Sequence, residues 1–259
     1  MDGRDILHYR MVRALGTGAS GEAWLARDLR LHRDVVLKFI ADAHGADRRT
    51  WLEEEARSLA ALAHPGIATV HALENDGATS FLVTEYIDGE TLRELLGLGP
   101  LPVPEVMSMA LALADALRHA HARAVVHRDI KPENIVVDVE GEAHLVDFGI
   151  AALASRAGAS APGVYGTDGY MSPEQARGEP ADPRSDVYAF GVVMVEMLAG
   201  ARPRDLPVPV PQALRARGVP APLVRVVTRC LSASRARRYR DGGALFAALD
   251  GAAVAMGLR

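Results

Sequence analysis

Short apolar runs separated by polar or glycine-containing turns characterise residues 1–90. Five runs have the length and composition of strands: 9–15, 22–27, 34–40, 67–73 and 80–85. Within residues 47–63 the apolar positions instead return at close to helical spacing, and Pro65 follows. The pattern predicts a small sheet accompanied by one helix.

Longer apolar segments with helical spacing dominate from residue 103 onwards. Residues 103–124 are apolar around nearly the whole helix, which is typical of a buried central helix. A second strong helix begins after Asp182, which can cap it, and ends at Gly200. Weaker helical patterns and two short strand-like runs complete this part: 222–231, 241–255, 134–138 and 143–147. A mainly helical second part is expected.

Six prolines fall within residues 202–222, so we expect mostly loop or polyproline-like backbone there. A compact loop without a function is the preferred interpretation. A docking segment for a proline-recognising partner is the alternative.

Composition describes a folded globular protein, with 49% hydrophobic and 24% charged residues among 259. The net charge of −4 without long charge runs gives no indication of a nucleic-acid partner or of an anionic membrane surface. No apolar run is long enough for a membrane span. The single cysteine, Cys230, excludes an intrachain disulfide and is expected to be buried, which favours a reducing, cytoplasmic setting.

A glycine-rich turn and a lysine in an apolar strand are the first candidates for chemistry. Gly16, Gly18 and Gly21 lie between two predicted strands, where backbone without side chains can approach phosphates closely. A purely structural hairpin turn is the alternative. Lys38 needs a partner in its apolar strand, and Glu55 of the predicted helix offers one. A lysine reaching solvent from an edge strand remains the other interpretation.

Lysine is almost absent from this chain. Of 29 basic residues only Lys38 and Lys131 are lysine, and all others are arginine. A compact ammonium can reach one phosphate oxygen beside a carboxylate, whereas the bulky planar guanidinium cannot replace it there. The two exceptions therefore indicate an active phosphate site.

Three motifs occur in a characteristic order: HRDIKPEN at 127–134, DFG at 147–149 and SPE at 172–174. With the preceding features they resemble the eukaryotic-like, bacterial-type serine/threonine protein kinase catalytic domains over residues 9–255. The resemblance implies an α+β, bilobal fold in one domain spanning 1–259. A small antiparallel sheet with one helix would form the N-lobe (1–86), and a larger, mainly helical C-lobe would follow (87–259).

ATP and Mg²⁺ are the cofactors that the resemblance implies. Lys38, held by Glu55, would contact the α and β phosphates. Asp129 would orient the substrate hydroxyl and accept its proton, and Lys131 would stabilise charge on the transferring γ-phosphoryl group. Phosphoryl transfer needs alignment and charge neutralisation more than covalent catalysis, which these residue types can supply.

Asn134 and Asp147 match the family's Mg²⁺ ligands, and both offer the oxygen atoms that Mg²⁺ prefers. The positions that match the nucleotide site are Leu15, Gly16, Thr17, Gly18, Ala19, Ser20, Gly21, Ala23, Val36, Lys38, Thr84, Glu85, Ile87, Val136 and Asp147. Small Thr84 controls the rear of this pocket and predicts access for bulky inhibitors. Ala23 stands where the family usually has valine, and Val36 stands where it usually has alanine. Either the two changes in side-chain volume compensate each other, or the affinity for the nucleotide is lowered.

Two structural features of the family also have matches here. An apolar column joining the lobes, anchored at its base by Asp186, would consist of Leu59, Val70, His127 and Phe148. Glu174 and Arg238 match a buried ion pair that supports the substrate platform.

HRDIKPEN with Lys131, together with Thr167, resembles the serine/threonine kinases rather than the tyrosine kinases, which implies serine and threonine hydroxyls of proteins as substrates. Gly163 stands at a position that is commonly phosphorylated, and the remaining hydroxyls nearby are those of Ser155, Ser160 and Tyr165. Either Ser160 is an activating switch or the segment needs none, and we prefer the second hypothesis.

Protein substrates are the expected partners, and the activity expected is transfer of the ATP γ-phosphate to their hydroxyls, including autophosphorylation. A homodimer through the N-lobe is familiar in similar bacterial kinases, although no residue here identifies it. A nucleotide-binding pseudokinase or scaffold is the alternative that the intact Lys38, Asp129, Asn134 and Asp147 disfavour. A small-molecule kinase is disfavoured by the SPE segment and Thr167.

Overall fold

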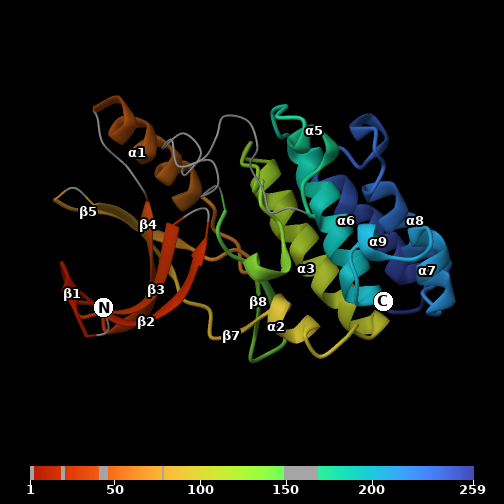
Figure 1. The fold of residues 1–259 in the computed structure, drawn as a ribbon, viewed down its shortest axis with the longest axis horizontal. Helices are drawn as coiled ribbons and strands as arrows, with labels where there is room; N and C mark the ends of the chain where they lie inside the picture. The colour runs from red at the N-terminus through yellow and green to blue at the C-terminus, as the bar shows by residue number, and fades with distance from the viewer. Residues whose placement is uncertain (1–2, 19–20, 41–45, 78, 149–168) are drawn as a thin grey trace.

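The computed structural model describes residues 3–18, 21–40, 46–77, 79–148 and 169–259, and the architecture below concerns these residues. It forms two lobes, with strands at one end and helices at the other (Figure 1). The N-lobe sheet is antiparallel in the order β1-β2-β3-β4-β6-β5. Its strands are β1 (Asp5–Ile6), β2 (Tyr9–Gly18), β3 (Gly21–Asp28), β4 (Arg33–Ile40), β5 (Val70–Asp76) and β6 (Thr79–Glu85).

Side chains of the N-lobe sheet alternate between two apolar clusters, as the twofold period of a strand requires. On β6, Phe81 and Val83 join one cluster, while Leu82 between them joins the core shared with helix α1 (Ala46–Ala60). The helix contributes Leu52 and Leu59 to that core. Packing against α1 thus gives the sheet two buried faces.

The C-lobe is built around α3 (Val103–His121) and α6 (Pro183–Ala199), with α7 (Val210–Ala216), α8 (Ala221–Cys230) and α9 (Gly242–Ala255) packed outside them (Figure 1). Shorter elements are α2 (Leu92–Leu96), α5 (Pro173–Ala176) and the 3-10 turns η1 (Pro132–Asn134), η2 (Pro203–Asp205) and η3 (Arg235–Arg237). A second sheet joins β7 (Gly89–Thr91), β8 (Ile135–Asp138) and β9 (Ala143–Leu145). Nearly every residue of α6 from Ser185 onwards is buried, which explains its apolar sequence.

The ends of α6 confirm the predicted signals. The Asp182 carboxylate accepts the Arg184 N–H at 2.7 Å, and Gly200 adopts the left-handed conformation with φ of 71°. Cys230 is buried, as expected. Among the helices in the described ranges, none has the length and apolar character needed to cross a membrane.

Two element predictions were wrong in part. The strand predicted at 67–73 begins only at Val70, because Ile67 forms an isolated bridge with Leu145 of β9. Within the proline-rich segment, residues 210–216 form helix α7 rather than loop. Pro211 lies in the first turn of α7. Backbone N–H groups in the first turn of a helix have no acceptor within that helix, so proline, which lacks the N–H, is compatible with this position.

Candidate active site

The glycine-rich turn joins β2 to β3, with Gly16 opposite Ala23 and Gly18 opposite Gly21. Gly21 has φ of 113°, and a Cβ there would lie 2.1 Å from the Phe39 carbonyl oxygen. Only glycine fits this close approach of two strands. Ala19 and Ser20 lie outside the described residues, as do all residues from 149 to 168, including Ser155, Ser160, Gly163, Tyr165 and Thr167.

Lys38 lies on β4 opposite Ala23 of β3 and Leu82 of β6. Its ammonium forms an ion pair with Asp147, whose backbone has the unusual φ of 69°. Glu55 on α1 is partly buried, and no ion pair joins it to Lys38 within the described ranges. The predicted Lys38–Glu55 pair is therefore not formed in this structure, because Asp147 binds the ammonium instead.

Electrostatics link the only two lysines. Burial lowers the pKa of the Lys38 ammonium to about 7, and the positive charge of Lys131 acts in the same direction. The Asp147 carboxylate opposes both effects by favouring the charged form. Two positive charges that lie close enough to interact favour an anion near both of them.

The segment before β8 gathers three of the predicted catalytic side chains. The Lys131 ammonium lies 2.7 Å from Oδ2 of Asp129. The Asn134 Nδ2 donates to the Asp129 carbonyl at 2.8 Å and to its Oδ2 at 3.1 Å. Because these bonds use the amide nitrogen of Asn134, its Oδ1 is the atom suited to bind a cation.

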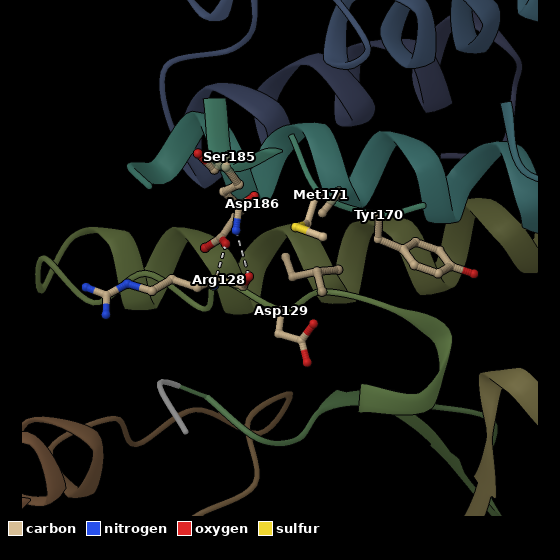
Figure 2. Close-up of a pocket in the computed structure, with 9 residues that line it drawn as sticks. Arg128, Asp129, Tyr170, Met171, Ser185 and Asp186 are labelled. Carbon is tan, nitrogen blue, oxygen red and sulfur yellow. Dashed lines mark hydrogen bonds between the residues drawn. The ribbon is translucent and has the colours of Figure 1, made fainter. Parts of the chain in front are cut away.

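Asp186 of α6 holds the backbone that presents Asp129. Its buried carboxylate accepts the N–H groups of His127 and Arg128, both at 2.8 Å, and contacts Nε2 of His121 at 2.9 Å. Arg128 has a strained φ of 72°, which these bonds help to maintain. Figure 2 shows the Asp186 carboxylate directed at this backbone, while that of Asp129 points away from α6.

His127 joins this backbone to Phe148. Its Nε2 donates to the Val146 carbonyl at 3.0 Å, and its ring centroid lies 4.5 Å from that of Phe148. Burial lowers the pKa of His127, so the imidazole is neutral. Leu59 and Phe148 belong to one core cluster, and Val70 packs against it.

Sheet register brings together two positions of the expected nucleotide site. Val36 of β4 lies opposite Thr84 of β6, and both are buried. The Glu85 N–H donates to the Thr69 carbonyl at 2.8 Å. Ile87 and Val136 are partly buried, and Leu15 is 38% exposed.

The predicted pair between Glu174 and Arg238 is confirmed. Both side chains are buried, and two hydrogen bonds of 2.6 and 2.9 Å join them. Ser172 caps α5, and the Gln175 Nε2 donates to the Arg128 carbonyl at 2.9 Å. The SPE segment is therefore fixed directly against the segment that carries Arg128 and Asp129.

A network around Arg93 was not predicted. Arg93 of α2 donates to Glu133 at 2.8 Å, to Glu196 at 2.7 Å and to the hydroxyl of Tyr170. One signal for it exists in the sequence: Glu196 interrupts the apolar run VVMVEMLAG, and a buried charge needs a partner. The sequence could not identify that partner, because Arg93 is 103 residues away.

A family model, related sequences and solved structures all indicate the same family for this chain. Residues 9–207 match the protein kinase domain family. Serine/threonine-protein kinase PknB of Mycobacterium leprae is 37% identical over 93% of this chain and 42% of its own length. PknA of Mycobacterium tuberculosis is 37% identical over 91% of this chain and 59% of its own. The chain thus spans about two-fifths of the PknB relatives it matches.

Among solved structures, the crystal structure of the Mycobacterium tuberculosis PknI kinase domain superposes with a TM-score of 0.76 and 28% identity. The superposition covers 97% of this chain and 99% of that one. The fold, the order of the motifs and the sequence matches all indicate the same family. The chain belongs to the protein kinase domain family, among whose members are bacterial serine/threonine-protein kinases.

Proposed function

We propose that this chain is a single catalytic domain that transfers the γ-phosphate of MgATP to serine and threonine hydroxyls of proteins. The observation that carries the proposal is the contact of Asp129 with both Lys131 and Asn134, together with the Lys38–Asp147 pair, whose lysine has a pKa that burial lowers and that the charge of nearby Lys131 lowers further. The serine/threonine-protein kinase names of its relatives support the substrate class. The need for ATP and the buried lone thiol support a cytoplasmic location.

The residues present fit Mg²⁺ and ATP. Asp147 offers a buried carboxylate oxygen, Oδ1, beside the Lys38 ammonium, and the Asn134 Oδ1 is not used by the bonds that its Nδ2 makes. Mg²⁺ takes few protein ligands and completes its shell with phosphate and water. Bound Mg²⁺ neutralises phosphate charge.

The chain's own side chains then have separate roles in the transfer. The Asp129 carboxylate accepts the proton of the attacking hydroxyl, and Lys131 beside it offsets the charge that develops on the transferring group. Lys38 positions the other phosphates. A shift of α1 that brings Glu55 to Lys38 would release Asp147 to bind the cation.

The test is Asp129→Asn, measured with labelled ATP and a generic protein substrate. We expect transfer to fall by at least about 100-fold while nucleotide binding persists, because the substitution removes the proton acceptor and its ion pair with Lys131 but leaves Lys38 and Asp147 unchanged. Asp250→Asn, at a partly exposed site distant in sequence, is the matched control and should retain full activity. Nucleotide binding without transfer in the wild-type chain would instead support a pseudokinase.

An N-lobe homodimer remains our proposal for assembly. Leu31 and Leu7 are 64% and 49% exposed. Their turns adjoin, since the Leu29 N–H donates to the His8 carbonyl at 2.9 Å. Exposed leucines next to one another favour a protein contact. Sedimentation of wild type and Leu31→Glu checks this: a monomeric wild type contradicts it.

A further inference from the structure

Residues 206–240 have a charge composition unlike that of the rest of the chain. They contain eight arginines and no aspartate, glutamate or lysine. Their charge is therefore +8 in a chain whose net charge is −4, so the other residues together carry −12. Such a separation of charge produces a strong local field, which the bulk composition conceals.

Six of these arginines are exposed and form no ion pair with a carboxylate within the described ranges: Arg215, Arg217, Arg225, Arg229, Arg235 and Arg237, which we name the arginine surface. The other two are paired, Arg238 with Glu174 and Arg240 with Asp241. Exposed arginines elsewhere often have partners, as Arg10 has Asp5 and Arg27 has Asp34. A hydrogen bond from Arg177 lowers the pKa of the Glu179 carboxylate, and the charge of the nearby Arg235 lowers it further. Most of the charge of the arginine surface thus stays available for another molecule.

Helix α8 and turn η3 place several of these guanidinium groups close together. The apolar side of α8 is buried, and Arg225 and Arg229 lie one turn apart on its exposed side. Arg229 lies over the Tyr239 ring at 4.4 Å and donates from Nε to the Arg237 carbonyl at 3.2 Å. This connects α8 to η3, so Arg225, Arg229 and Arg237 form one continuous region.

The arginine surface also adjoins the expected substrate platform. Turn η3 ends next to Arg238, whose buried pair with Glu174 attaches it to α5. Helices α7 and α8 lie at the end of the C-lobe far from the N-lobe sheet (Figure 1). A protein that presents a hydroxyl to Asp129 could therefore extend over α5 onto η3 and α8.

We propose that the arginine surface docks an aspartate- and glutamate-rich segment of the protein substrate, at a distance from the phosphorylated hydroxyl. This inference rests on the proposed function in so far as the docked protein is a substrate. Binding of an acidic segment to the arginine surface does not require that function. Guanidinium groups bind carboxylates through two parallel hydrogen bonds, which suits an acidic peptide. Docking raises the local concentration of the acceptor hydroxyl, and hence lowers KM.

An anionic membrane surface and a nucleic acid fit the arginine surface less well than an acidic protein segment does. Among the described residues, the large apolar side chains that are exposed all lie outside 206–240, so this region lacks the apolar face of a membrane-binding helix. The aromatic residue of the segment, Tyr239, is buried beneath Arg229, so no ring is available for base stacking.

The test compares one acceptor peptide fused through a flexible linker to oligoglutamate or to oligoglutamine. We expect about a five- to tenfold lower KM for the glutamate fusion at low salt, with kcat unchanged and the difference decreasing as salt is added. Arg225→Glu with Arg235→Glu should abolish the difference. The matched control, Arg4→Glu with Arg123→Glu, changes net charge equally at other exposed arginines and should preserve it.

Fluorescence anisotropy of labelled oligoglutamate separates this inference from the proposed function, because it needs no catalysis. Binding that Arg225→Glu with Arg235→Glu removes supports the docking site even in a chain without transferase activity. Equal KM values for both fusions in the wild type would overturn it. So would tighter binding of an oligonucleotide or of anionic vesicles than of oligoglutamate at physiological salt.

Discussion

Arg238 offers a quantitative test of how the C-lobe is held together. Its buried guanidinium binds both carboxylate oxygens of Glu174, at 2.6 and 2.9 Å. It also donates to the carbonyls of Ser232 at 2.8 Å and Arg184 at 3.0 Å, and lies 4.8 Å from the Tyr188 ring centroid. Loss of this side chain would leave the Glu174 carboxylate buried without a cation.

The size of the effect follows from the pKa of Glu174. Burial by itself raises this pKa, but hydrogen bonds from Arg238 and Ser185 lower it from 4.5 to about 2. The difference corresponds to about 3 kcal/mol at pH 7. Because the folded pKa lies below the unfolded one, this stability is fully present above about pH 4.5 and is lost as pH falls through about 2.

We expect Arg238→Met to lower the free energy of unfolding by about 3 to 5 kcal/mol at pH 7, measured by urea titration with circular dichroism. The unpaired carboxylate of the variant will protonate readily, so its deficit should shrink between pH 7 and pH 4. Adding Glu174→Gln should restore part of the loss. A deficit below about 1 kcal/mol, or one equal at both pH values, would refute the reasoning.

Three further predictions concern the cleft and the C-lobe. Amine-reactive labelling, read by mass spectrometry, should modify Lys38 with a midpoint near pH 7, and MgATP should protect both Lys38 and Lys131; a midpoint above about pH 9 contradicts the burial argument. Gly242→Ala should lower the melting temperature, because its Cβ would lie 2.4 Å from a backbone nitrogen of α3, whereas Gly251→Ala on the same helix meets nothing within 4 Å and should not. Thr84→Met should weaken binding of bulky ATP-site inhibitors at least about tenfold while ATP affinity changes little, as competition assays can show.

Local patterns were sufficient for much of the fold. Alternation and helical spacing located β3, β4, α3 and α6, because each buries one stripe or its whole surface. Local patterns were insufficient for the start of β5 and for α7. Ile67 pairs with Leu145 of β9, so β5 begins only at Val70. Helix α7 forms because proline is tolerated in the first turn of a helix. The candidate site depended on motif order, which placed Asp129, Lys131 and Asn134 in one short segment.

The sequence alone determined which chemical groups the cleft can offer, because the two lysines and the motif carboxylates are fixed by their positions in the chain. Only the tertiary structure decided which charges meet. Lys38 pairs with Asp147 rather than Glu55, and Arg93 reaches Glu196 across 103 residues. Charge pairing acts through space and depends on how the lobes and helices are placed, which no local period in the sequence encodes.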